Sequence, residues 1–259
     1  SVLAAGRHTN VHALGSGAPV LLIQGSGPGV TAWANWRLVM PALAQSCRVI
    51  APDMAGFGYT ERLPGDVHTM EGWVAHAIGV LDALGIERTA PVGNSFGGAI
   101  ALALAIRHPA RVRRLVLMGS VGVPFEITQA LDAVWGYQPS LEAMRGLLDL
   151  FAFDRSLVND ELARLRYEAS INPGFQTLLK TPGAFGEWEN LAPVFARVRA
   201  PTLIFWGLHD CFGGIDVPML MLNQFADARL HVIGRAAHHL QSECPDEFNA
   251  HLLAFLEGR

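Results

Sequence analysis

Six short apolar segments, separated by stretches with helical spacing, constrain the fold of this 259-residue chain most strongly. The segments cover residues 19–23, 47–51, 89–92, 112–118, 202–206 and 230–233. Continuous apolar runs of this length are typical of strands buried on both faces of a parallel sheet. Helical spacing predicts crossover helices at 36–44, 69–84 and 99–108, the last ended by Pro109. The pattern therefore predicts an α/β fold with a mostly parallel central sheet and helices on both faces.

Residues 126–198 interrupt this alternation. They show mainly helical periodicity, at 139–151, 159–167 and 187–198, and contain no convincing strand. The predicted organisation is a core in two parts, residues 1–125 and 199–259, with a helical lid at 126–198 inserted between them. A lid of this kind excludes water and shapes a substrate pocket. The alternative is an ordinary second helical domain.

The third apolar segment leads directly into the sequence V-G-N-S-F-G-G, residues 92–98, and then into a predicted helix. A G-x-S-x-G pentapeptide between a strand and a helix is typical of the nucleophile elbow of α/β-hydrolases. Its glycines let the chain turn sharply, so that the serine hydroxyl is exposed above the sheet edge. The motif predicts the α/β-hydrolase fold, with Ser95 as the nucleophile.

A serine nucleophile needs a base and an acid that orients it, and in this fold they follow the serine in the order acid, histidine. Asp210 lies just after the fifth apolar segment, and His238 and His239 follow the sixth. Asp210 is therefore the predicted acid, with Asp216 as its competitor. Spacing alone does not decide which of the two adjacent histidines is the base.

Electrophilic stabilisation is predicted from the loop after the first apolar segment, L-L-I-Q-G-S-G-P-G (21–29). A glycine-rich turn exposes backbone N–H groups, and two such groups form the oxyanion hole of a hydrolase. We expect the N–H of Ser26 to pair with the N–H of Phe96, the residue after the nucleophile. A phosphate-binding loop is excluded because no G-K-[ST] sequence and no dinucleotide fingerprint follow.

Composition excludes several other classes of function. The net charge is −4 and the 19 Lys and Arg residues are scattered, so no basic surface for nucleic acid or membrane lipid is predicted. The three cysteines have no C-x-x-C spacing, which favours reduced thiols, and no metal site is expected. No secretory signal and no long apolar stretch is visible, so a cytoplasmic location is expected.

Several longer segments resemble the meta-cleavage-product hydrolases. These are α/β-hydrolases of bacterial aromatic catabolism that cleave a carbon–carbon bond in 2-hydroxy-6-oxohexa-2,4-dienoates. The matching segments include S-G-P-G with T-A-W-A-N-W at the start of 25–44, together with 48–62, 92–120, 152–175 and 227–256. The similarity is greatest to the branch that acts on 2-hydroxymuconic semialdehyde and its alkyl analogues.

The resemblance implies roles for individual residues. The family's catalytic histidine follows a small residue and precedes a tryptophan, which selects His238 as the base and puts His239 at the tryptophan position. Arg166 lies where the family has its carboxylate-binding arginine, and Asn35 and Asn94 match asparagines near the polar end of the dienoate. Alternative roles are a solvated helix residue for Arg166, a helix cap for Asn35 and an elbow-stabilising amide for Asn94. The aromatic candidates for the far end of the pocket are Trp135, Phe151, Phe175 and His239.

The family mechanism implies two stages and no metal or organic cofactor. A proton first moves to C5 of the bound dienol, and Ser95 or water then attacks C6, with His238 as base and Asp210 orienting it. The products are a 2-hydroxypenta-2,4-dienoate and a small acid, which is formate for the semialdehyde. Similar proteins commonly form dimers or larger even-numbered assemblies, so a homo-oligomer is expected.

The sequence departs from the family at three places, and two other classes of function stay open. Gln24 replaces a histidine before the oxyanion loop, His239 replaces the tryptophan, and C-F-G-G (211–214) replaces the usual sequence after the acid. A carboxylesterase would use the same triad without needing Arg166, and a non-catalytic binding protein on this fold would use none of it. The preferred C6 substituent is the least constrained prediction.

Overall fold

The central sheet has the strand order β3-β5-β4-β6-β7-β8-β9 in the computed structural model, which describes residues 1–66, 68–120, 122, 128–171 and 190–259. Its strands are β3 (Val11–Leu14), β4 (Ala18–Ile23), β5 (Cys47–Pro52), β6 (Ala90–Asn94), β7 (Leu115–Met118), β8 (Thr202–Gly207) and β9 (Ala228–Ile233). Neighbouring strands pair in parallel, except that β3 runs antiparallel to β5. The predicted α/β fold with a mostly parallel sheet is confirmed.

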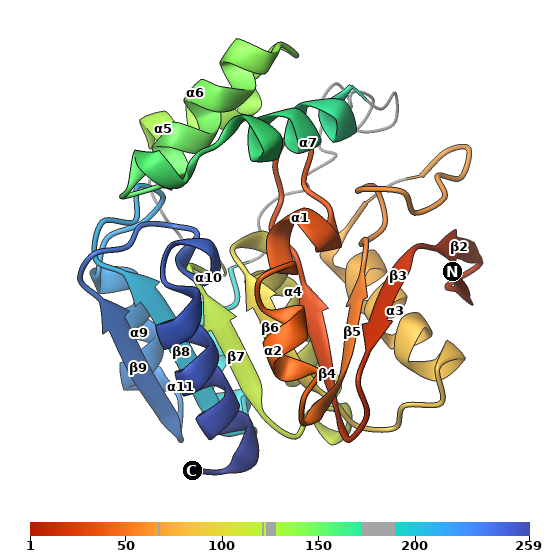
Figure 1. Ribbon diagram of the computed structural model, residues 1–259. Helices are drawn as coiled ribbons and strands as arrows, with labels where there is room; N and C mark the ends of the chain where they lie inside the picture. The colour runs from red at the N-terminus through yellow and green to blue at the C-terminus, as the bar shows by residue number, and fades with distance from the viewer. Residues whose placement is uncertain (67, 121, 123–127, 172–189) are drawn as a thin grey trace.

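Helices cover both faces of this sheet (Figure 1). Side chains of successive strand residues point to opposite faces: on β4, Leu21 and Ile23 join one hydrophobic cluster and Val20 and Leu22 join the other. The first cluster is completed by α3 (Met70–Ala83), α4 (Phe96–Arg107) and α9 (Asp216–Gln224). The second is completed by α1 (Ala32–Trp36), α2 (Met40–Leu43), α10 (Leu240–Glu243) and α11 (Pro245–Glu257). Full burial of each such aliphatic side chain contributes about 1.5–3 kcal/mol.

Three details of the core and of the predicted lid differ from the prediction. The single helix predicted at 36–44 is wrong: α1 ends at Trp36 and α2 begins at Met40. Pro41 has no N–H to continue the first helix but is tolerated in the first turn of the second. The described part of the helix predicted at 187–198 is a 3-10 helix, η3 (Ala192–Arg197). The N-terminal strands β1 (Val2–Ala4), β2 (Arg7–Thr9) and β3 were not predicted.

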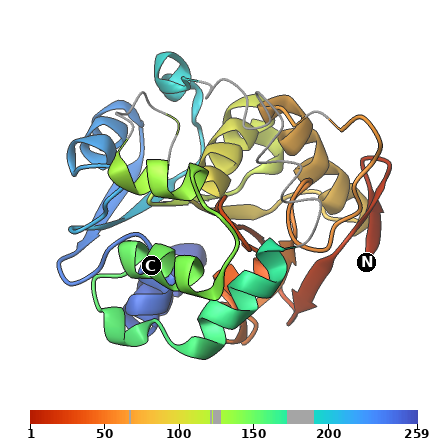
Figure 2. The same ribbon diagram turned by 90° about the horizontal axis from the view of Figure 1, so that it is seen from above.

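Four helical elements lie above the carboxyl ends of the parallel strands (Figure 1): α5 (Gln129–Trp135), α6 (Leu141–Phe151), η2 (Arg155–Leu157) and α7 (Asp160–Ser170). We call residues 129–170 the helical cap. Seen from above, it covers the side of the core that carries α1 and α11 (Figure 2). The cap has a small hydrophobic cluster of its own, which includes Met144, Leu147 and Phe151. Among the described helices, none combines the length and the apolar character that a membrane crossing requires.

Candidate active site

Ser95 lies in the sharp turn between β6 and α4, at the sheet edge below the cap. Its backbone has φ 53° and ψ −116°, and Ala5 is the other non-glycine residue with positive φ in the described ranges. The Ser95 N–H donates to the carbonyl of Met118 at 2.8 Å, which fixes the turn to β7. Such a conformation costs about 1–3 kcal/mol and is typical of functional sites, where surrounding contacts hold it in place.

The two glycines of the pentapeptide are required by close backbone contacts. A Cβ atom on Gly93 would lie 2.2 Å from the carbonyl oxygen of Gly97. A Cβ on Gly97 would lie 2.3 Å from the carbonyl oxygen of Ile23 and 2.4 Å from that of Gln24. Both separations are far below van der Waals contact, so no larger residue fits at either position. The motif thus packs the start of α4 against the end of β4, where the glycine-rich loop begins.

Asp210 and His238 form a buried pair on the loops after β8 and β9. Asp210 Oδ2 lies 2.8 Å from His238 Nδ1, and the two side chains are 1% and 5% exposed. The other carboxylate oxygen accepts the N–H of Phe212 at 2.9 Å. A carboxylate only accepts hydrogen bonds, so the neutral imidazole carries its proton on Nδ1 and has a lone pair on Nε2. The competing Asp216 is the first residue of α9, and the hydrogen bond favours Asp210 as the orienting acid.

Gly119, for which no role was predicted, makes room for the Asp210–His238 pair because it has no side chain. A Cβ atom there would lie 3.0 Å from Nδ1 of His238 and 3.1 Å from Oδ2 of Asp210. Its φ of +52° is also in the left-handed region that favours glycine. The only sequence signal is a glycine directly after the apolar segment that forms β7.

The glycine-rich loop after β4 lies against the nucleophile. A Cβ atom on Gly25 would be 3.5 Å from Cβ of Ser95 and 3.1 Å from Oδ1 of Asn94. Ser26 follows Gly25 in the chain and so lies close to the elbow. Phe96 begins α4 directly after Ser95. The Phe96 ring is fixed edge-on against Trp73, with 4.5 Å between ring centroids. This arrangement brings the backbone of both predicted oxyanion residues to the same side of the sheet edge as Ser95.

Gln24 braces this loop against the end of β5. Its side chain is 1% exposed. With the carboxamide oriented to satisfy both ends, its NH2 donates to the Pro52 carbonyl and its oxygen accepts the Met54 N–H, each at 2.9 Å. A glutamine can thus hold the loop in the place where the resembling family has a histidine.

Arg166 of α7 is a buried cation, so the alternative of a solvated helix arginine is wrong. It is 4% exposed, and Nε and Nη2 donate to the Pro28 carbonyl at 3.1 and 3.0 Å. Burial lowers its pKa to about 10, so the guanidinium is still charged at neutral pH. Within the described part of the chain, no carboxylate pairs with it, and Nη1 is left for another acceptor.

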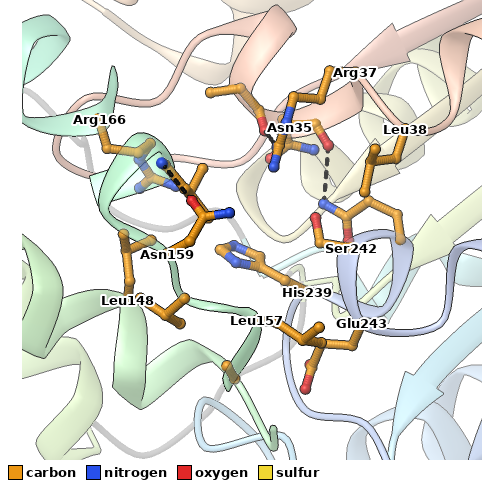
Figure 3. A pocket seen from close by; sticks show the side chains of 15 residues that line it. Asn35, Arg37, Leu38, Leu148, Leu157, Asn159, Arg166, His239, Ser242 and Glu243 are labelled. Carbon is orange, nitrogen blue, oxygen red and sulfur yellow. Dashed lines mark hydrogen bonds between the residues drawn. The ribbon is translucent and has the colours of Figure 1, made fainter. Parts of the chain in front are cut away.

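Three of the predicted substrate contacts line one cavity of about 220 Å³ between the cap and the core. Figure 3 shows the His239 ring between Arg166 and Asn159 on one side and Asn35 and Ser242 on the other. The cavity walls do not include Ser95 or His238. The full lining is Ala34, Asn35, Arg37, Leu38, Leu148, Ala152, Leu157, Val158, Asn159, Leu162, Arg166, His239, Gln241, Ser242 and Glu243.

The two asparagines have different surroundings. Asn35 is 7% exposed, and its Nδ2 has no hydrogen-bond partner among the described residues, which leaves a donor at the cavity wall. It does not cap α1, because that role belongs to Thr31, whose side chain accepts the Ala34 N–H. Asn94 lies beside the elbow and donates from Nδ2 to the Met118 carbonyl at 3.4 Å. Its position thus matches the alternative of an amide that stabilises the elbow.

His239 presents a neutral imidazole to the cavity. Burial lowers its pKa well below the ordinary range, and the nearby His238 and Arg166 lower it further. Its ring centroid is 5.0 Å from that of Phe151, so this member of the predicted aromatic set lies beside it. Phe175 and the side chain of Trp135 lie outside the described part of the chain.

The carboxyl end of α6 is attached to both loops that carry the acid and the base. The Phe151 carbonyl accepts the His238 N–H at 3.2 Å, and the Leu150 carbonyl accepts the Cys211 thiol at 3.1 Å. Burial raises the pKa of this thiol to about 12, so it remains a protonated donor. The Phe212 ring lies beside both Phe151 and His238, at 5.1 and 4.4 Å between centroids.

Glu243 of α10 completes this attachment from the other side. Its Oε2 accepts the N–H groups of Phe153 and Asp154 in the cap, at 2.6 and 3.3 Å. Its Oε1 accepts the N–H of Ala237, directly before His238, at 2.9 Å. One carboxylate therefore joins the cap to the histidine loop, a role that no local sequence signal indicates.

Comparison with known proteins agrees with this geometry. The α/β hydrolase fold family model matches residues 18–245. A 2-hydroxymuconate semialdehyde hydrolase of Pseudomonas sp. (strain CF600) is 57% identical over 248 residues, which cover 93% of this chain and 88% of the relative. A 2-hydroxy-6-oxo-2,4-heptadienoate hydrolase of Pseudomonas putida is 54% identical over 249 residues, 93% of this chain and 90% of the relative. The chain belongs to the meta-cleavage-product hydrolases.

A solved structure of a meta-cleavage product hydrolase from Pseudomonas fluorescens extends the match to three dimensions. It superposes with a TM-score of 0.94 at 48% identity and covers 99% of this chain and 96% of that one. The family predicted from the sequence segments is thus confirmed. In this meta-cleavage-product hydrolase, the serine elbow, the Asp210–His238 pair and the glycine-rich loop lie at one sheet edge. The Asp210–His238 pair, with a lone pair on Nε2 of the imidazole, is suited to act as a general base.

Proposed function

We propose that this meta-cleavage-product hydrolase cleaves the C5–C6 bond of 2-hydroxy-6-oxohexa-2,4-dienoates and prefers a small C6 substituent, as in 2-hydroxymuconic semialdehyde. Arg166 is the observation that carries this proposal. A buried guanidinium that pairs with no carboxylate among the described residues is stabilised by an anionic ligand, and its planar fork suits a carboxylate. The dienoate carboxylate supplies that anion. The names of the two Pseudomonas relatives, a semialdehyde and a heptadienoate hydrolase, support a small substituent.

In the proposed binding mode, the carboxylate of the dienoate lies at Arg166, and the 2-hydroxy or 2-oxo group of the dienoate lies near Asn35. The unpartnered Nδ2 of Asn35 donates to that oxygen, and the neutral His239 forms the adjacent wall. The dienoate chain then extends past the glycine-rich loop toward Ser95. Because the Arg166 guanidinium also holds Pro28 of that loop, binding of the carboxylate is linked to the position of the Ser26 N–H.

The first chemical stage is a proton transfer. The 2-hydroxyl proton leaves and a proton is delivered to C5, which converts the dienol into a 2,6-diketone with a cleavable C5–C6 bond. We assign this transfer to Ser95 and His238, since the lone pair on Nε2 accepts a proton that it can return. Asp210 holds the imidazole in the required tautomer.

The second stage is addition at C6 and cleavage. Ser95 Oγ, or a water deprotonated by His238, adds to the C6 carbonyl, and the N–H groups of Ser26 and Phe96 stabilise the oxyanion. Collapse of the adduct breaks the C5–C6 bond and leaves its electron pair on the dienolate. On the serine route, water then hydrolyses the acyl-enzyme. Overall, one water is consumed, and the semialdehyde gives 2-hydroxypenta-2,4-dienoate and formate.

The direct test is spectrophotometric. Purified protein is mixed with 2-hydroxymuconic semialdehyde and with its methyl and phenyl analogues, and the decay of each yellow chromophore is followed. We expect the highest kcat/KM for the semialdehyde, then the methyl, then the phenyl compound. Ser95→Ala should abolish the decay of all three. If the wild-type protein consumes none of them, carbon–carbon bond hydrolysis is rejected.

Arg166→Ala separates the dienoate hydrolase from a carboxylesterase. Removing one partner of a buried charge pair costs about 2–4 kcal/mol, so dienoate kcat/KM should fall by roughly 30- to 1,000-fold. Loss of the contact with Pro28 lowers both activities, so the informative quantity is the ratio of dienoate to p-nitrophenyl acetate hydrolysis. Arg145→Ala, on the exposed face of α6, is the matched control and should leave both activities unchanged. An unchanged ratio in Arg166→Ala would remove the proposed carboxylate clamp.

The proposed partners are the small-molecule dienoate and further copies of the same chain. We propose a cytoplasmic homo-oligomer, on the basis of the assemblies that are common among similar proteins. Sedimentation velocity at micromolar concentration tests the oligomer, and a single monomeric species would contradict it.

A further inference from the structure

Three side chains that could bind a metal ion gather on the surface between β9 and α11, outside the catalytic machinery. His231 belongs to β9, and Glu247 and His251 belong to α11. Residues four apart lie on the same face of a helix, so Glu247 and His251 present their side chains together. The α11 helix packs on the sheet through Phe248, whose ring is 4.5 Å from that of Phe205. The expectation of no metal site rested on the cysteine spacing, and it missed this cluster because His231 lies on β9, away from the two ligands on α11.

The geometry of the cluster is close to that of a metal site. His231 Nε2 is 3.0 Å from Glu247 Oε1, and the ring centroids of His231 and His251 are 3.9 Å apart. One ligand atom from each of the three residues lies within 4.8 Å of the others. Bonds of about 2.0–2.1 Å to a tetrahedral zinc ion place neighbouring donor atoms about 3.3 Å apart. Small side-chain rotations therefore bring all three donors to one ion.

The cluster is also accessible and partly held in advance. The side chains of His231 and Glu247 are 28% and 48% exposed, so an ion can reach them from solvent. The Phe205 ring packs edge-on against His231 at 5.8 Å, which limits the positions of that imidazole. Two imidazole nitrogens and a carboxylate oxygen are ligands typical of zinc, and a three-residue set leaves a coordination position for water.

We propose that His231, Glu247 and His251 form a binding site for a divalent transition-metal ion, with Zn²⁺ as the preferred ion. Coordination joins β9, the edge strand of the sheet, to the C-terminal helix α11. The ion has no part in the cleavage reaction, because its ligands belong to none of the groups that bind or convert the dienoate. Its effect is on stability: an ion that binds the folded chain and not the unfolded one raises the melting temperature.

The experiment is a titration of metal-free wild-type protein with ZnCl2 at pH 7.5, followed by isothermal calorimetry and by thermal unfolding. Coordination requires unprotonated imidazoles, so the titration is made above neutral pH. We expect saturable binding of one equivalent and a rise in Tm at saturation. Absence of binding by the wild-type protein would overturn the proposal and leave an ordinary hydrogen bond between His231 and Glu247.

Variants then locate the site. His251→Ala and His231→Gln should each weaken zinc binding by at least about tenfold and remove the rise in Tm. His8→Ala, which removes an exposed histidine on β2, is the control and should bind zinc as the wild type does. Dienoate turnover reports that every variant is folded. Equal zinc affinity in the wild type and in both ligand variants would show binding elsewhere and overturn the assignment.

Co²⁺ gives an independent reading of the ligands. Replacement of Zn²⁺ by Co²⁺ should produce visible absorption bands from the bound ion, and these should be lost in His251→Ala and kept in His8→Ala. Bands of equal intensity in His251→Ala would again contradict the site.

Discussion

The sheet edge that carries the catalytic residues and the helical cap above it are stabilised in different ways. At the sheet edge, polar groups are buried and paired, as Asp210 and His238 are at 1% and 5% exposure. The cap has a small hydrophobic cluster, a buried hydrogen bond between Tyr137 and Ser170, and an exposed ion pair between Arg145 and Asp160. Exposed pairs of this kind contribute about 0–1 kcal/mol. The cap's position therefore depends on its attachments to the core more than on its own polar contacts.

Arg166 attaches α7 to the glycine-rich loop, and the attachments of α6 reach the loops that hold the acid and the base. The last carbonyls of a helix have no partner within the helix, and α6 directs two of them to His238 and Cys211. Movement of the α6 end is thereby coupled to the histidine loop. We therefore expect a change at the sheet edge to affect catalysis directly, and a change in the cap to act through these attachments.

The same substitution, glycine to alanine, can be made in both regions. Among the changes that compare the two regions, the largest loss of activity is expected at Gly119, in the sheet edge. Gly119→Ala places a Cβ atom 3.0 Å from the His238 ring at a φ of +52°. Displacement of the imidazole should lower kcat by about 100-fold, and the backbone strain should cost about 1–3 kcal/mol of stability. The measurements are chromophore decay and urea unfolding.

Gly146→Ala in α6 is the matched change in the cap. A Cβ atom there meets nothing within 4 Å. Alanine is more favourable than glycine inside a helix. The free energy of unfolding of the variant should therefore rise by about 0.5–1 kcal/mol, and its activity should stay unchanged. Equal losses of activity in the two glycine variants would refute the difference between the regions.

An acid-dependent loss of stability is expected from the core. His76 of α3 is buried, with Nε2 2.8 Å from Thr9 Oγ1 and Nδ1 accepting the Ala55 N–H at 3.2 Å. Burial lowers its pKa from 6.5 to about 4, so the unfolded chain binds the proton more tightly. Neutral His76 makes its full contribution to the free energy of unfolding above pH 6.5. About 3 kcal/mol of that free energy is lost as the pH falls to about 4.

His76→Gln keeps one donor and one acceptor without titrating. Its free energy of unfolding, measured in urea between pH 7 and pH 4, should fall less steeply than that of the wild type. The slope is the informative quantity, since the substitution also changes packing. Identical slopes would assign the acid sensitivity to other groups.

A smaller loss of activity than that of Gly119→Ala is expected at the joint between the two regions. Glu243→Gln replaces one carboxylate oxygen by an NH2 group, which cannot accept the N–H groups now bound there. Hydrogen bonds to a charged group contribute about 1.5–3 kcal/mol each, and partial loss should lower kcat/KM roughly tenfold. Hydrogen exchange should quicken in α6 and α7 and stay unchanged in α3.

Glu87→Gln, an exposed residue of the core, is the control for charge alone. It should match the wild type in both activity and exchange. Unchanged exchange in α6 of Glu243→Gln would show that this carboxylate does not hold the cap.

Local patterns predicted the features that depend on neighbouring residues. Continuous apolar runs identified β4 to β8 because these strands are largely buried, and a shorter run identified the edge strand β9. The pentapeptide identified the elbow because its glycines meet nearby backbone. Strands β1 to β3 were not predicted because they are short and partly exposed, and β2 consists of polar residues.

The spacing of residues in the sequence did not predict contacts between distant parts of the chain. Glu243 accepts hydrogen bonds from residues 89 and 90 positions away, and Gly119 is constrained by side chains from two other loops. The choice of His238 over His239 came from family resemblance, and the pairing with Asp210 now favours it on geometry. Sequence spacing indicates which residue types are available, whereas packing decides which of them meet.

The amide of Gln24 has a consequence for how this enzyme responds to its medium. A histidine at that position would gain or lose a proton between about pH 5 and pH 8, and the hydrogen bonds to Pro52 and Met54 would change with it. A carboxamide has no such transition. The loop that carries Ser26, a predicted oxyanion donor, is therefore anchored by a group that does not titrate in this range, so the pH at which the enzyme works can be set by its base.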